Sequence, residues 1–148
     1  MITNLREQIQ RDEGGYQRFC YQDSRGYWTI GFGRCVDRKI GKGISLAEAE
    51  AMLDADLLEF STSVLAGLPW TYRLDEPRRA VLVGLAYNIG MGDADRGTGL
   101  LGFKKMLAAV ESGDYPVAAQ ALLDSKYRKQ VGLRCDRLAR QLETGEWT

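Results

Sequence analysis

The stretch DEGGYQRFCYQDSRGYWTIGFG, from Asp12 to Gly33, changes its pattern part-way along and decides what kind of fold the chain can form. Its start closes a short amphipathic helix, because Leu5 and Ile9 are one turn apart and four more residues bring the same face to Glu13. Two glycines then end the helix. Aromatic and β-branched residues follow over Phe19–Phe32, around the turn-forming run DSRG. The stretch predicts a helix and then a β-hairpin.

The second strand of this hairpin is predicted over Tyr27–Phe32. Gly31 and Gly33 allow another part of the chain to approach the backbone closely there. The next stretch, Arg34–Gly43, is rich in charge and glycine, so it is predicted as a loop or an irregular third strand.

The rest of the chain has the periodicity of α-helices. Ser45 and Glu48 have the spacing of a capping box, and apolar residues recur every three or four positions from there to Gly67. Asp75 can cap the next helix, which is apolar on nearly every face and should be buried. Further helices are predicted over Leu100–Glu111, Tyr115–Asp124 and Leu133–Leu142, with loops at Asp93–Gly99 and Lys126–Gly132.

This order of elements predicts a mostly helical α+β fold with two lobes. A small β-containing lobe covers about residues 14–45, residues 46–65 form a connecting helix, and residues 1–13 with 66–148 form a helical lobe. Because no repeat or low-complexity linker interrupts the chain, we expect one domain over residues 1–148.

Composition narrows the chemistry. Twenty basic and twenty acidic residues cancel, so charge does not call for nucleic acid as a partner. The chain has no histidine, which excludes a Ser-His-Asp triad, a Cys-His pair and a histidine-ligated zinc site. Cys20, Cys35 and Cys135 lack metal-site spacing and are expected to be buried free thiols. Histidine- and cysteine-ligated metal sites are therefore not expected.

The chain also lacks the patterns of export and membrane insertion. Met1–Gly15 is polar and has no secretory signal, and the longest apolar stretch is far shorter than the ~18 residues needed to span a bilayer. We expect a soluble cytoplasmic product without stable membrane insertion.

Glu13 and Asp23 are the candidate reacting pair. Glycoside hydrolysis needs one carboxylic acid to protonate the leaving oxygen and one carboxylate to activate water or attack the sugar. An apolar helix face would raise the pKa of Glu13, whereas Asp23 at a turn would stay ionised. Taken singly, each residue has a plainer interpretation, a solvated helix end for Glu13 and a turn former for Asp23.

The ordered set of motifs resembles the signature of the phage-type lysozymes, the endolysins of glycoside hydrolase family 24. These motifs are Asp-Glu-Gly at 12–14, Tyr-x-Asp at 21–23 and Gly-Tyr-x-Thr-Ile-Gly-x-Gly at 26–33. The resemblance implies a lysozyme-like fold with Glu13 as proton donor, Asp23 acting with the water and Thr29 helping to hold it. It also implies a muramidase, which hydrolyses the β-1,4 bond between N-acetylmuramic acid and N-acetylglucosamine with inversion.

Further residues match the family's order in the rest of the chain. The resemblance implies substrate contacts at four positions and an ion pair between Arg134 and the catalytic Glu, which would oppose the effect of burial on the Glu13 pKa. The four positions are Cys35, Tyr87, Asn88 and Phe103. Without the resemblance, an aromatic residue such as Tyr87 at helical spacing is more often part of the core.

The chain departs from the family pattern in three places. The spacing from Glu13 to Asp23 is one residue longer than in the best-known members, so the sequence leaves the strand register near Arg18–Cys20 open. Arg34 stands where many relatives have histidine, and the loop Met91–Gly99 is longer than usual.

The implied partner is the glycan of bacterial peptidoglycan, bound by a monomer, and the implied reaction uses neither a metal nor an organic cofactor. The implied setting is the host bacterial cytoplasm, with action on the cell wall after release to the periplasm, for host-cell lysis by a phage or prophage. Two alternatives stay open: a non-catalytic peptidoglycan-binding module, and a lytic transglycosylase. The second needs the Glu but no water-activating carboxylate, so Asp23 disfavours it.

Overall fold

The computed structural model describes every residue except 1, 25 and 36–43. Its contacts divide the chain into two compact units, Arg6–Leu58 and Met1–Leu5 with Glu59–Thr148. We call the first the sheet unit and the second the helical unit. The chain passes from one to the other inside two helices, α1 (Leu5–Asp12) and α2 (Leu46–Gly67).

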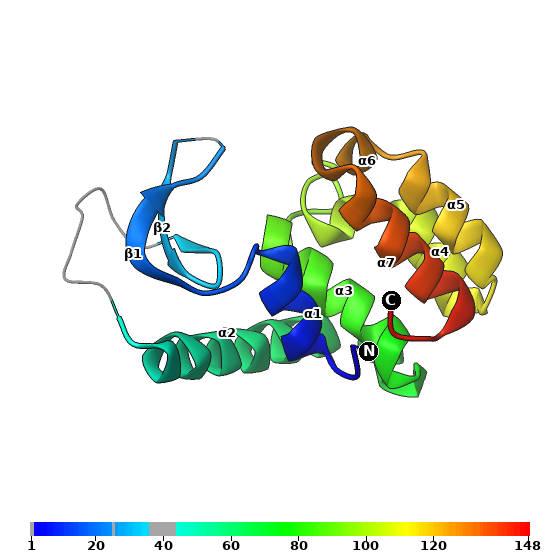
Figure 1. Ribbon diagram of the computed structural model, residues 1–148. Coiled ribbons are helices and arrows are strands. Elements are labelled where there is room, and N and C mark those ends of the chain that lie inside the picture. The colour runs from blue at the N-terminus through cyan, green and yellow to red at the C-terminus, as the bar shows by residue number, and fades with distance from the viewer. Residues whose placement is uncertain (1, 25, 36–43) are drawn as a thin grey trace. The chain divides into compact units, whose positions relative to one another are not determined.

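The sheet unit contains a small antiparallel sheet, in which β1 (Gln17–Gln22) and β2 (Trp28–Gly31) lie side by side (Figure 1). The third strand, β3 (Arg34–Cys35), pairs with the other edge of β2. The predicted hairpin is therefore confirmed, as is a short third strand. The rest of the stretch predicted as loop or strand, 36–43, lies outside the described residues.

The pairing of β1 with β2 contains an irregularity. Gln17 pairs with Gly31 and Tyr21 with Thr29, so four steps along β1 correspond to two steps along β2. Extra residues of this kind form a β-bulge, which bends a strand and changes the direction of its side chains. The register near Arg18–Cys20, which the sequence left open, is therefore irregular. Its consequence is that Tyr21 lies directly opposite Thr29.

Helix α2 begins with the predicted capping box. The Ser45 backbone N–H donates to the Glu48 carboxylate at 2.7 Å, and the Glu48 N–H donates to the Ser45 hydroxyl at 3.2 Å. The hydrogen bonds from Ser45 lower the pKa of Glu48. The helix ends at Gly67, where the apolar periodicity also ends.

The helical unit is built around α3 (Glu76–Ile89), whose N-terminus is capped by the Asp75 side chain at 2.9 Å from the Arg78 N–H. Every residue of Ala80–Ala86 is buried, which confirms this helix as the predicted central one. Helices α4 (Lys104–Ser112), α5 (Tyr115–Leu123) and α7 (Leu133–Thr144) lie side by side (Figure 1). The largest fully buried side chains of this unit include Leu82, Leu85, Leu100, Met106, Leu122 and Leu142.

Two predictions about the helices are wrong. Lys126–Gly132 is not a loop throughout, because Lys126–Val131 forms α6, whose Tyr127 side chain is buried. The high charge of this segment hid its two apolar residues, Tyr127 and Val131, which are one helical turn apart.

Leu100–Glu111 is also not a single helix. It consists of a 3₁₀ turn, η2 (Leu100–Gly102), followed after Phe103 by α4. The backbone of Gly97 packs closely against Gly102, and a Cβ added at Gly102 would be only 2.6 Å from Gly97 backbone atoms. We attribute the interruption of the helix to this close packing. A second 3₁₀ helix, η1 (Pro69–Arg73), precedes α3 and was not predicted.

The three cysteines are free, but they differ in their surroundings. Cys135 is buried as predicted, and its burial raises the pKa of the thiol to about 11. Cys20 is half-buried, and Cys35 is exposed because it belongs to the short edge strand β3. The prediction of buried thiols is thus confirmed for Cys135 and wrong for Cys35. Among the described helices, none is both long and apolar enough to cross a membrane.

Candidate active site

Glu13 is the first residue after α1, and its backbone N–H donates to the Ile9 carbonyl at 2.9 Å. Its half-buried side chain packs against the turn between β2 and β3. In that turn Gly33 has a φ of +79°, and a Cβ at this position would collide with the Glu13 carboxylate. The predicted close approach at Gly33 is therefore confirmed, and the part of the chain that approaches is the candidate acid.

Asp23 follows β1 and organises the hairpin turn. Its Oδ1 accepts a hydrogen bond from the Tyr27 N–H at 2.9 Å, and its backbone carbonyl accepts one from the Gly26 N–H at 2.9 Å. The plainer interpretation of Asp23 as a turn former is thus correct. It does not exclude the reacting role, because these bonds also fix the half-buried carboxylate at the end of β1.

Thr29 lies in the middle of the small sheet. Its side chain is buried, and its hydroxyl donates to the Tyr27 carbonyl at 3.2 Å. In the sheet it pairs with Tyr21 on one side and with Cys35 on the other. The hydroxyl therefore keeps a fixed orientation, with its oxygen lone pairs still able to accept a hydrogen bond.

The half-buried phenol of Tyr21 connects these groups. Burial raises the pKa of Tyr21, and the negative charges of Glu13 and then Asp23 raise it further. Both carboxylates therefore lie near the same phenol, and Thr29 lies opposite it in the sheet. The structure thus brings together the three residues of the predicted reacting site. Sequence reasoning used Tyr21 only as a motif residue, although its position two residues before Asp23 on one strand could have suggested a shared face.

In the helical unit, Tyr127 links two of the predicted substrate-binding residues. Its hydroxyl donates to Asn88 Oδ1 at 3.1 Å, and its ring meets Phe103 edge-on with 6.2 Å between centroids. Sequence reasoning assigned no role to Tyr127. The signal for it was a single aromatic residue in an otherwise charged segment, and a buried aromatic with a polar tip usually finds such a partner.

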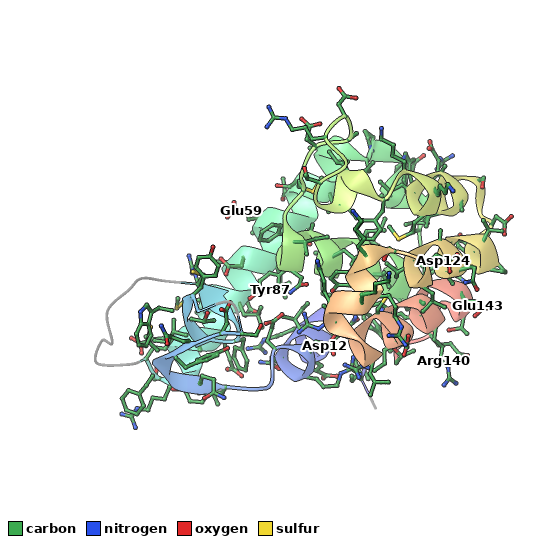
Figure 2. All side chains as sticks on the ribbon, turned by 90° about the horizontal axis from the view of Figure 1, so that it is seen from above. Asp12, Glu59, Tyr87, Asp124, Arg140 and Glu143 are labelled. Carbon is green, nitrogen blue, oxygen red and sulfur yellow. The ribbon has the colours of Figure 1, made fainter. Side chains whose placement is uncertain are left out.

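The remaining predicted site residues, Tyr87, Arg134 and Cys35, lie on different elements. Tyr87 extends from α3 (Figure 2), where it is half-buried and meets the Phe60 ring edge-on at 5.7 Å. Arg134 lies half-buried on α7, and Cys35 is exposed at the end of β3. The substrate contacts of these residues, the ion pair of Arg134 and the raised pKa of Glu13 stay predictions.

A family model described as phage lysozyme matches residues 11–143, which include all of these site residues. The chain belongs to the phage lysozyme family. Phage lysozymes are glycoside hydrolases of the lysozyme type, and the family's activity is hydrolysis of bacterial peptidoglycan.

Similar proteins fall into two groups. The chain is 25% identical to "Probable T4-type lysozyme 1" of Dictyostelium discoideum, over 98% of this chain and 96% of that protein. "Probable T4-type lysozyme 2" of the same organism shows the same identity and coverage. The chain is also 25% identical to the "Pre-baseplate central spike protein Gp5" of Enterobacteria phage T4, over 96% of this chain but only 28% of the spike protein.

The phage lysozyme family and the geometry of the sheet unit agree on the kind of chemistry. Two carboxylates near one phenol can supply an acid and a base without any metal. Among the described residues, no group of three or more histidine, cysteine, aspartate or glutamate side chains could hold a metal ion.

Proposed function

We propose that this chain cleaves the β-1,4 bond between N-acetylmuramic acid and N-acetylglucosamine in peptidoglycan, with Glu13 as the acid and Asp23 as the base. The observation that carries the proposal is the placement of both carboxylates beside Tyr21, in a chain of the phage lysozyme family. The two groups also have different surroundings. Glu13 packs against the backbone at Gly33, whereas Asp23 is held by hydrogen bonds in a turn.

The reaction assigns one step to each group. Glu13 transfers its proton to the glycosidic oxygen as the bond from that oxygen to the anomeric carbon breaks. Asp23 accepts a proton from a water molecule, whose oxygen attacks the anomeric carbon from the opposite face. The Thr29 hydroxyl already donates to the Tyr27 carbonyl, so it holds the water by accepting its second hydrogen. A single attack of this kind inverts the anomeric configuration.

Replacement of Glu13 by glutamine tests the acid directly. The amide keeps the shape of the side chain but has no proton of suitable acidity, so we expect a loss of about 10²- to 10⁴-fold in hydrolysis with unchanged folding. Turbidity of permeabilised Gram-negative cells measures the activity, and thermal unfolding measures the fold. A Glu13→Gln variant that clears cells at the parent rate would remove Glu13 as the acid.

Product analysis distinguishes hydrolysis from the two alternative functions. We expect reducing sugar ends of inverted configuration, which proton NMR detects during the first turnovers. Mass spectrometry of an anhydro-sugar product would instead identify a lytic transglycosylase. A folded protein that binds peptidoglycan without releasing any fragment would be a binding module.

We also propose a role in lysis of the bacterial host, with the protein acting as a monomer on the periplasmic side of the wall. The alternative is a part in the virion, which the name of the phage T4 relative specifies for that protein. Expression in a Gram-negative host, with and without a membrane pore produced alongside, tests this, because we expect the culture to lyse once the protein reaches the periplasm. Sedimentation equilibrium tests the monomer, and detection of the chain in purified particles would favour the virion role.

A further inference from the structure

Tyr21 lies at the centre of the candidate site, but the proposed mechanism assigns it no role. It lies on β1 opposite Thr29, two residues before Asp23, and its ring is half-buried. Opposed residues of neighbouring strands point to the same face of a sheet, and so do residues two apart on one strand. Sheet geometry therefore directs the Tyr21 side chain to the same face as Thr29 and Asp23, independently of its acidity.

The hydroxyl of Tyr21 has no hydrogen-bond partner among the described residues. The hydroxyls of two other tyrosines that are not fully exposed do have a hydrogen-bond partner. Tyr16 donates to the Ile44 carbonyl, and Tyr127 donates to Asn88 Oδ1. A tyrosine hydroxyl that is withdrawn from water usually finds such a partner. The polar tip of Tyr21 is therefore available for a group that comes with the substrate.

The surroundings of Tyr21 decide which kind of hydrogen bond it makes. Burial raises the pKa of Tyr21, and the carboxylates of Glu13 and Asp23 raise it further when they are ionised, so the hydroxyl keeps its proton and acts as a donor. Its neighbour across the sheet, Thr29, already donates its own proton to the Tyr27 carbonyl. Tyr21 is thus a neutral hydrogen-bond donor whose proton is used neither in the proposed proton transfers of Glu13 and Asp23 nor in a bond to the protein.

We propose that Tyr21 is a substrate-contacting residue, whose O–H donates a hydrogen bond to an oxygen atom of the amino sugar at the bond to be cleaved. The hydroxyl, ring and N-acetyl oxygens of an amino sugar are all hydrogen-bond acceptors, so the sugar supplies the acceptor for the Tyr21 hydroxyl. The inference rests on the proposed function. The contact forms when the sugar binds, so its loss weakens binding and leaves the chemical steps of Glu13 and Asp23 in place.

Tyr21→Phe tests the contact, since it removes only an oxygen that has no described partner. Against a soluble hexasaccharide of alternating N-acetylglucosamine and N-acetylmuramic acid, we expect KM to rise about tenfold with kcat within about twofold, the loss expected for one hydrogen bond. The melting temperature should stay that of the parent. Tyr72→Phe is the matched control, because this tyrosine lies in η1 of the helical unit with its ring exposed, and it should change neither constant.

A binding measurement separates this inference from the proposed function. Titration calorimetry compares the Kd of the same hexasaccharide for Glu13→Gln and for Glu13→Gln combined with Tyr21→Phe, and we expect the double variant to bind about tenfold more weakly. Equal Kd values would overturn the role of Tyr21, and so would an equal loss in Tyr72→Phe. If Glu13→Gln retained activity, this would contradict only the assignment of Glu13 as the acid. The role of Tyr21 would still be decided by Kd values measured at a temperature where cleavage is negligible.

Discussion

The helical unit buries the side chains of Leu82, Leu85 and Leu100 completely. The sheet unit instead contains the buried side chain of Thr29 and the half-buried carboxylates of Glu13 and Asp23. The first arrangement gains free energy of folding from every apolar side chain removed from water. The second keeps polar groups partly withdrawn from water, which costs stability but gives them the strong electrostatic interactions that catalysis uses. The difference indicates that the helical unit contributes most of the stability, whereas the chemistry proposed above lies in the sheet unit.

The largest expected effect is on activity, from Asp23→Asn in the sheet unit. The amide oxygen can still accept the hydrogen bond from the Tyr27 N–H, so the turn should persist while the base is lost. We expect hydrolysis to fall by about 10²- to 10⁴-fold, with the free energy of unfolding changed by less than about 0.5 kcal/mol.

A control in the helical unit shows whether this loss is specific. Asp114 accepts a similar backbone hydrogen bond, from the Val117 N–H at the start of α5. Asp114→Asn should therefore leave hydrolysis unchanged in the same assay. An Asp23→Asn variant with most of its activity would show that the sheet unit does not use this carboxylate as the base.

Leu85→Ala should have the opposite effect, a large loss of stability with little loss of activity. Leu85 is fully buried on α3, so its truncation leaves a cavity and should lower the free energy of unfolding by about 2–5 kcal/mol. Activity per folded molecule should stay near that of the parent. Leu133→Ala is the control, since Leu133 is 72% exposed and should change stability by no more than about 0.5 kcal/mol. Urea unfolding gives both values, and a small change in Leu85→Ala would contradict a stabilising core in α3.

Gly33→Ala should affect both stability and activity. The φ of +79° costs about 1–2 kcal/mol for a residue with a Cβ, and the new methyl group would push the Glu13 carboxylate from its place. Gly113 has nearly the same φ, +80°, but nothing within 4 Å of a new Cβ. Gly113→Ala should therefore lose similar stability with full activity, whereas Gly33→Ala should lose at least about tenfold in kcat, because catalysis depends on ångström-scale placement. Equal activities would show that the contact with Gly33 does not position Glu13.

The two units also differ in how far their sequence predicts them. The helices of the helical unit follow from local signals such as the Asp75 cap and the apolar run Ala80–Ala86. Helix α6 was missed because its two apolar residues, Tyr127 and Val131, stand in a charged segment, and a single pair one turn apart is a weak signal of a helix. The break at Phe103 was missed because it depends on packing of Gly102 against Gly97, which lie close in space without a local signal.

In the sheet unit, Glu13, Asp23 and Thr29 were recognisable as an ordered motif. The place of Tyr21 among them was not, because it depends on the pairing of β1 with β2. The bulge between Gln17 and Tyr21 decides which residue faces Thr29, and a shift of one residue would turn Tyr21 to the other face. Strand register depends on contacts between distant residues, so local propensity does not determine it.

The smallest expected effect concerns the capping box at the start of α2, and it depends on pH. The folded pKa of Glu48 is lowered below its ordinary value of 4.5 by the hydrogen bonds from Ser45, so folding favours the ionised carboxylate. The resulting stabilisation is fully present above pH 4.5 and is lost as the pH falls through the folded pKa. Glu48→Gln keeps a hydrogen-bonding cap but lacks this charge. Its melting temperature should be slightly below that of the parent at pH 7 and equal to it at pH 2.5. A difference that grew on acidification would mean that the protonated form of Glu48 makes the stabilising contact.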